Sequence, residues 1–179
     1  MNVFDLPTPG APYQQLAAEL REIRKYLVDP ADPNETAGDG RTLLLLALGL
    51  CVDSEGEALA MRLLERGADP NKPTPCAIFT KLLTASNSLP LVTKLVECGL
   101  RLNDVYDLSR AQGWLTDGPS TLLDHAYAIR DSISPKRKNL DALANKYAGG
   151  LGGRRRFIDE TIALLELHGA KRASDLERS

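Results

Sequence analysis

The sequence predicts an all-α chain in which helical hairpins lie side by side. Three observations indicate this fold class. The tetrapeptide Ala-Asp-Pro-Asn occurs twice, at residues 31–34 and 68–71. Apolar residues recur seven, four and three positions before a glycine, a spacing that places them on one stripe of a helix. A threonine lies 25 residues before that glycine in two successive repeats, at Thr42 and Thr74.

The apolar stripe defines the second helix of each repeat. In one repeat it consists of Ala60, Leu63 and Leu64. The position that follows the helix reads Pro30, Gly67, Gly99 and Gly169 in the four repeats. Glycine suits the left-handed conformation that ends a helix, whereas Pro30 cannot adopt it, so the first repeat is expected to end differently. A single such helix has nothing to bury its stripe against, and the array is therefore stable only as an array.

The first helix of each repeat is expected to begin at a threonine. The sequence reads TLLLLAL at 42–48, TPCAIFT at 74–80 and TLLDHAY at 121–127. Loops rich in Asn, Asp, Gly and Pro follow the second helices. Residues 12–28 are predicted to form one amphipathic N-terminal helix with an apolar inner face. That face consists of Tyr13, Leu16, Leu20, Ile23 and Leu27.

The run GRTLLLLA at 40–47, LLERGADPN at 63–71 and LELHGAK at 165–171 resemble the ankyrin repeat family. The resemblance implies an ankyrin-type solenoid of about four repeats including caps, whose loops and concave face of first helices bind proteins. Another helical-hairpin solenoid is the alternative, but it would not need the Ala-Asp-Pro-Asn loop. The histidine that braces the family's loops is replaced by Leu45, Ala77 and Asp124. Leu45 is either an additional core residue or an apolar spot on the binding face.

The predicted domain boundaries follow the repeats. Residues 1–11 are expected to form a flexible arm, because residues 5–12 are rich in proline and glycine, and residues 174–179 are expected to form a tail. The ankyrin-like domain spans residues 12–173. Its parts are an N-terminal cap repeat at 12–34, repeats at 35–71 and 72–103, and an expanded C-terminal repeat at 104–173.

Two expansions distinguish the last repeat. Thr121 precedes Gly169 by 48 residues instead of 25, which indicates an insertion of 23 residues at about 131–153. We expect a helix near 136–147 and a flexible joint at the glycine-rich residues 148–153. The second expansion is the loop at 104–120, which contains Tyr106 and the only tryptophan, Trp114. That tryptophan is either a binding anchor or a cover for the end of the core.

The charge is uneven along the chain. Residues 136–156 contain seven basic residues and one acid, a net charge of +6, whereas the whole chain carries −2. The basic segment is either solvated or docks onto an acidic partner. Its candidate contacts are Lys136, Arg137, Lys138, Arg154, Arg155 and Arg156. A nucleic-acid or anionic-surface binder that uses this segment is the alternative function.

No residue pattern indicates catalysis, a cofactor or a metal site. His125 follows Asp124, but adjacent residues of a helix do not face each other, so no Asp-His dyad is expected. Cys51, Cys76 and Cys98 are odd in number and widely spread, which favours a reducing compartment, the cytoplasm. The longest apolar run, at 43–52, is too short to span a bilayer.

The expected function is therefore a non-enzymatic protein–protein interaction module. A dedicated adaptor or a stoichiometric inhibitor, such as an immunity protein, is the specific form we expect, with the free chain a monomer. Another protein is the expected partner, and neither nucleic acid nor a membrane is. The candidate partner-binding residues are Asp39, Arg41, Lys72, Asp104, Tyr106, Arg110, Trp114 and Asp117.

Overall fold

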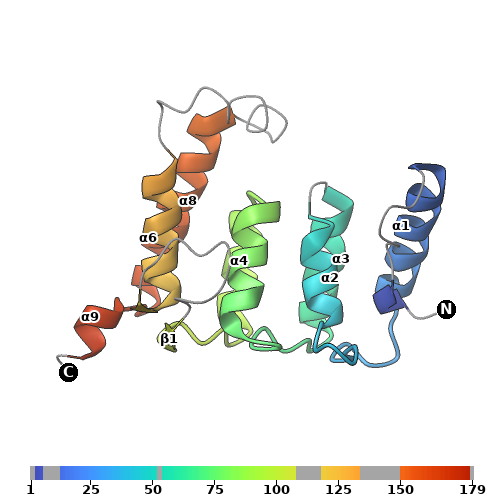
Figure 1. Cartoon of the computed structure of the whole chain (residues 1–179), viewed down its shortest axis with the longest axis horizontal. Coiled ribbons are helices and arrows are strands. Elements are labelled where there is room, and N and C mark those ends of the chain that lie inside the picture. The colour runs from blue at the N-terminus through green and yellow to red at the C-terminus, as the bar shows by residue number, and fades with distance from the viewer. Residues whose placement is uncertain (1–2, 6–12, 52–53, 108–117, 134–149, 178–179) are drawn as a thin grey trace. The chain divides into compact units, whose positions relative to one another are not determined.

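The computed structural model describes residues 3–5, 13–51, 54–107, 118–133 and 150–177. The chain divides into two compact units, Met1–Ser86 and Asn87–Ser179. The described residues are mostly helical, with eight α-helices, one 3-10 helix and two strands of two residues each (Figure 1). The predicted helical class is confirmed for this part of the chain.

The first unit contains four of the helices. They are α1 (Tyr13–Val28), α2 (Leu43–Gly49), α3 (Ser54–Glu65) and α4 (Pro75–Ala85). Helix α2 packs against both α3 and α4, and α1 packs against α3. The predicted stripe of α3 faces this core, because Ala60, Leu63 and Leu64 are all buried. The core of the first unit also contains Ile23, Leu27, Leu43, Leu44, Leu48, Ile78, Phe79, Leu82 and Leu83.

The helices of the first unit begin and end where the sequence indicates. The Thr42 and Thr74 side chains are the N-caps of α2 and α4, and accept hydrogen bonds from the third residue of each helix. Gly67 has a φ of +91° and follows α3. Its N–H and that of Ala68 donate to Leu64 and Leu63, the bonding pattern that commonly ends a helix at glycine.

The end of α1 differs from the others, as Pro30 predicts. The carbonyl of Pro30 accepts a hydrogen bond from Nη2 of Arg66 (2.8 Å). The same guanidinium pairs with the carboxylate of Asp29. An arginine just beyond α3 therefore holds the segment that a glycine shapes after the other second helices.

Part of the expected N-terminal arm is held against the first unit. Residues Val3–Asp5 form a 3-10 helix, and the side chain of Phe4 is only 2% exposed. The carbonyl of Phe4 accepts a hydrogen bond from Nη2 of Arg41 (2.6 Å). Residues 3–5 thus differ from the flexible arm that the proline-rich composition suggested.

The second unit contains the other four helices and the two strands. The helices are α5 (Leu89–Glu97), α6 (Leu122–Ser132), α8 (Gly150–Leu167) and α9 (Ala173–Leu176). Helix α8 packs against α6 and α5, and a core of aliphatic side chains and Phe157 lies between them. Strands β1 (Tyr106–Asp107) and β2 (Pro119–Ser120) pair antiparallel. They close the base of the long loop, where the sequence indicated no strand.

The predicted insertion at 131–153 includes the first turn of α8. Helix α6 ends at Ser132 and α8 begins at Gly150, so residues 133–149 connect them. The expectation of a glycine joint reaching residue 153 is wrong, because residues 150–153 are the first turn of α8. Glycine costs a helix about 1 kcal/mol relative to alanine, but the packing of α8 further along stabilises the helix. The predicted helix at 136–147 lies outside the described residues.

Candidate partner-binding surface

The same loop bracket occurs in both units. In the first, the side-chain amide of Asn34 donates to the carbonyl of Gly67 (2.9 Å), and its oxygen accepts from the N–H of Asp69 (2.8 Å). In the second, Asn103 donates to the carbonyl of Gly169 (3.1 Å) and accepts from the N–H of Lys171 (2.7 Å). Each asparagine thus fixes the turn after the second helix of the following repeat.

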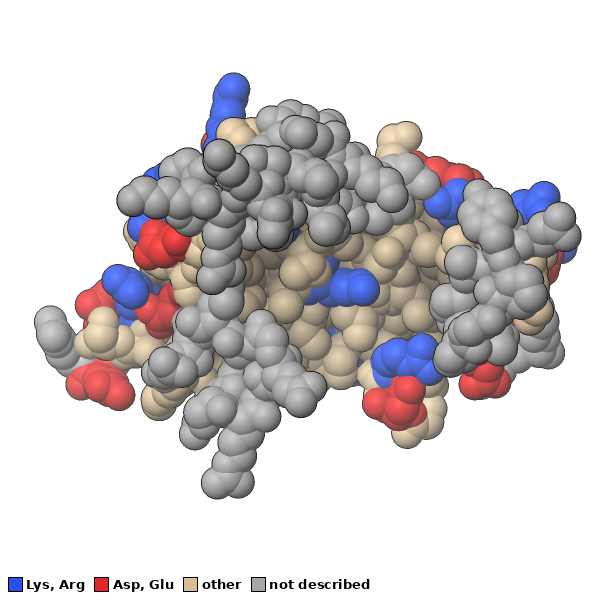
Figure 2. All heavy atoms as spheres, turned by 45° about the horizontal axis from the view of Figure 1, so that its top comes forward, with Lys and Arg blue, Asp and Glu red and all other residues tan. Residues whose placement is uncertain are grey.

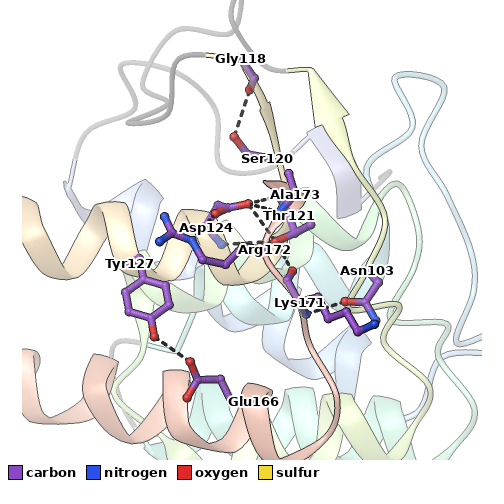
Figure 3. Close-up of polar contacts among 10 residues, drawn as sticks. All are labelled: Asn103, Gly118, Ser120, Thr121, Asp124, Tyr127, Glu166, Lys171, Arg172 and Ala173. Carbon is purple, nitrogen blue, oxygen red and sulfur yellow. Dashed lines mark hydrogen bonds and ion pairs between the residues drawn. The ribbon is translucent and has the colours of Figure 1, made fainter. Parts of the chain in front are cut away.

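Asp124 joins the start of α6 to the start of α9 (Figure 3). Its carboxylate accepts hydrogen bonds from the N–H and the hydroxyl of Thr121 (both 3.1 Å), which completes a capping box. The same carboxylate accepts from the N–H of Ala173 (2.8 Å) and from Nε of Arg172 (2.8 Å). Asp124 therefore braces the segment that precedes α9.

The hydrogen bonds of Asp124 also set its charge. Burial opposes ionisation of this carboxyl, but the hydrogen bonds from Ala173, Arg172 and Thr121 outweigh burial and lower its pKa below the usual value. A charged acceptor makes stronger hydrogen bonds than a neutral one. The ionised form of Asp124 therefore stabilises the second unit.

Tyr127 lies near Asp124, one turn further along α6 (Figure 3). Its hydroxyl donates to Oε1 of Glu166 (2.7 Å), a contact that raises the pKa of the tyrosine. The guanidinium carbons of Arg130 and Arg172 lie 4.6 and 5.1 Å from the centre of its ring. We call Tyr127, Arg130, Arg172 and Glu166 the Tyr127 cluster. It joins an aromatic ring, two cations and a carboxylate on a partly exposed surface.

His125, the neighbour of Asp124, faces the core. Its side chain is only 2% exposed, and burial lowers its pKa to about 4. The carboxylate of Asp124 instead accepts hydrogen bonds from Thr121, Arg172 and Ala173, as described above. The two adjacent side chains therefore lie in different environments. His168, the other histidine, directly follows α8 and is exposed.

The predicted contacts in the first unit lie on loops. Asp39 and Arg41 form an ion pair within a tight turn (2.7 Å), and hydrogen bonds from Arg41 lower the pKa of Asp39. Lys72 is exposed, and its carbonyl accepts a hydrogen bond from the Thr42 hydroxyl (3.4 Å). The structure thus brings Asp39 and Arg41 together, while Arg41 also holds the carbonyl of Phe4.

The predicted contacts in the second unit lie at the base of the long loop. Asp104 pairs with Arg101 (3.1 Å), and Tyr106 is a half-buried residue of β1. The remaining predicted loop residues lie outside the described part of the chain: Arg110, Trp114 and Asp117.

The basic segment lies only partly within the described residues, which resume at residue 150. Lys136, Arg137 and Lys138 lie outside the described residues. On α8, Arg154 donates to Oδ1 of Asn87 (2.9 Å) and Arg156 pairs with Glu160 (2.8 Å), while Arg155 is exposed. On the face shown in Figure 2, basic side chains of the described residues mostly lie close to acidic ones.

Neither a metal cluster nor a membrane helix occurs in the described residues. Within them, no three His, Cys, Asp or Glu side chains are placed to hold a metal ion. No helix among them is both long and apolar enough to cross a bilayer. The three cysteines are free thiols, and burial raises the pKa of Cys76 to about 12.

The Tyr127 cluster was missed by the sequence analysis. Tyr127 and Arg130 are three residues apart on α6, a spacing that places them on one face and could have been noticed. Arg172 and Glu166 belong to other segments, so only the tertiary structure brings them to this tyrosine. Comparison with known proteins finds no matching family model, no matching curated protein and no matching solved structure.

Proposed function

We propose that this chain is an ankyrin-type repeat protein that binds one partner protein and catalyses no reaction. It acts as an adaptor or as a stoichiometric inhibitor of its partner. The recurring asparagine bracket carries the proposal, because Asn34 and Asn103 make the same pair of contacts with the glycine turn of the following repeat. The recurrence of these hydrogen bonds supports a stack of hairpins with loops on one side.

The composition of the Tyr127 cluster supports protein binding. Tyrosine and arginine are enriched among the residues that dominate binding energy at protein interfaces. Here both arginines lie over the ring of Tyr127, so the three side chains are already ordered before a partner binds. Arg154 and Arg156 already bind side chains of this chain, Asn87 and Glu160 respectively. These contacts favour a protein as the partner over an anionic polymer.

The test is isolation of a partner followed by reconstitution from purified components. The partner is captured with the tagged full chain, purified, and titrated against the chain by calorimetry. We expect a one-to-one complex whose affinity falls at least about tenfold in the Tyr127→Ala variant. Tyr26→Ala is the matched control, since Tyr26 also donates to a glutamate, Glu35, but belongs to the first unit.

Two outcomes would contradict the proposal. One is the failure of every captured protein to form a stoichiometric complex with the purified chain. The other is capture of nucleic acid whose affinity for the chain collapses between low and physiological salt. Such salt dependence arises from counterion release and would favour the anionic-polymer function.

A further inference from the structure

We infer that the outward face shared by α2 and α4 binds an apolar segment of the partner that carries one carboxylate, and that Lys81 pairs with this carboxylate. This inference rests on the proposed function and names the chemistry of the partner. The face belongs entirely to the first unit, because α2 and α4 pack directly against each other there. We call it the Lys81 face.

The Lys81 face is uncharged apart from one lysine. Helix α2 has the sequence LLLLALG and α4 the sequence PCAIFTKLLTA, so Lys81 is the only ionisable side chain except for a buried cysteine thiol. The residues of the two helices that point away from the core are partly or fully exposed. They are Leu45, Leu46 and Gly49 on α2, and Ala77, Thr80, Lys81 and Thr84 on α4.

The apolar residues of this face are partly exposed, whereas its most exposed residues are Lys81 and Thr84. The sequence did not decide whether Leu45 is a core residue or a surface residue. Its side chain is partly exposed and so contributes to this face. The hydroxyl of Thr84 lies within hydrogen-bond distance of two carbonyls of its own helix, those of Thr80 (2.9 Å) and Lys81 (3.0 Å). The hydroxyl proton of Thr84 is therefore already bonded within α4 before a partner binds.

Gly49 determines where the lysine lies. A Cβ atom built on Gly49 would lie 3.1 Å from Cε of Lys81 and 3.5 Å from its Nζ. The end of the lysine side chain therefore lies against Gly49, the last residue of α2, which has no side chain. This places the ammonium group beside the C-terminal end of α2.

The ammonium of Lys81 selects the partner by its charge. In the described part of the chain, no carboxylate forms an ion pair with it, and no side-chain hydrogen bond involves it. An apolar segment that covered this face would remove the ammonium from water, which is strongly unfavourable without a counter-charge. A segment with one Asp or Glu among apolar residues supplies that charge, whereas a purely apolar or a basic segment does not.

The test uses a displayed library of random 16-residue peptides selected on the purified full chain. We expect the selected peptides to combine apolar residues with at least one Asp or Glu. A synthetic copy of such a peptide should lose about tenfold or more in affinity when its acid is replaced by the matching amide. The Lys81→Met variant should show the same loss and bind acid and amide peptides equally, and Lys81→Arg should restore the preference.

Two further variants make the test specific. Lys25→Met removes an exposed lysine of α1 and should leave the peptide affinity unchanged. Gly49→Ala keeps the lysine but places a methyl group against its Cε, so it should reduce the acid preference. Circular dichroism of each variant confirms that the helices remain.

Peptides without an acid, or acidic peptides that bind Lys81→Met and the unaltered chain equally, would overturn the inference. A dimer of this chain that Lys81→Met dissociates would overturn it too, since the occupant would be a second copy. The peptide experiment needs no natural partner. A partner complex that forms with unchanged affinity in Lys81→Met would refute this face alone, while the absence of any complex would refute the proposed function.

Discussion

The side-chain amide of Asn103 donates a hydrogen bond to the carbonyl of Gly169, 66 residues further along the chain. The corresponding pair in the first unit, Asn34 and Gly67, is separated by 33 residues. The insertion in the last repeat doubles the separation but leaves the contact intact. A repeat can therefore accept a long segment between its two helices while its loop keeps the same anchor.

The first prediction concerns this anchor. Asn103→Ala removes the bonds to Gly169 and Lys171, so we expect the free energy of unfolding to fall by about 1–2 kcal/mol. Asn34→Ala should have a similar effect, because its two bonds are equivalent. Urea unfolding followed by circular dichroism measures both. Unchanged stability in both variants would show that the brackets do not support the repeats.

The second prediction concerns the charge of Asp124. Asp124→Asn retains an acceptor but loses the negative charge, and we expect a loss of about 1–2 kcal/mol at pH 7. Because the folded pKa of Asp124 is lowered, this contribution is present above the unfolded pKa and disappears as the pH falls through the folded pKa. The two proteins should therefore converge in stability in acid. A constant difference at all pH values would contradict this role.

The third prediction is a separate pH dependence from His125. Burial lowers its pKa from 6.5 to about 4, so the unfolded chain binds the proton more readily between these values. The free energy of unfolding should be greatest above pH 6.5 and fall by about 3 kcal/mol as the pH decreases to 4. The comparison is with His125→Gln, measured by urea unfolding at several pH values.

His125→Gln should lose this slope whatever its stability at pH 7. Thr161→Val is a control that changes another fully buried polar side chain, on α8, without changing a titratable group. It should keep the slope of the unaltered chain. An equal slope in His125→Gln would assign the pH dependence to other groups.

The fourth prediction compares two helical glycines. A Cβ on Gly56 of α3 would lie 2.1 Å from the carbonyl oxygen of Leu50, so Gly56→Ala forces the backbone apart. We expect a loss of about 2–3 kcal/mol. Gly152 of α8 is exposed and has nothing within 4 Å of such a Cβ, so Gly152→Ala should stabilise the chain by about 0.5–1 kcal/mol. Thermal unfolding distinguishes the two, and equal effects would contradict the close approach at Gly56.

The described helix boundaries that the sequence predicted best are those with local signals. Thr42, Thr74 and Thr121 are N-caps, and Gly67 and Gly169 have positive φ after their helices. The glycine joint was placed wrongly because composition alone does not register that α8 packs along α6. The strand pair β1–β2 was missed because two residues are too few to show a strand pattern.

The sequence by itself determined most helices of the described residues and the threonines that cap three of them, but not the short helices at Val3–Asp5 and Ala173–Leu176, which fall in the expected arm and tail. These features depend on residues three to seven positions apart, which hydrogen-bond or share a face whatever else the chain does. Only the tertiary structure decided that Arg172 reaches Asp124 and Tyr127, that Arg41 holds the carbonyl of Phe4, and that the end of Lys81 lies against Gly49. Such contacts join segments tens of residues apart, and no local pattern specifies which distant side chain packing will bring within reach.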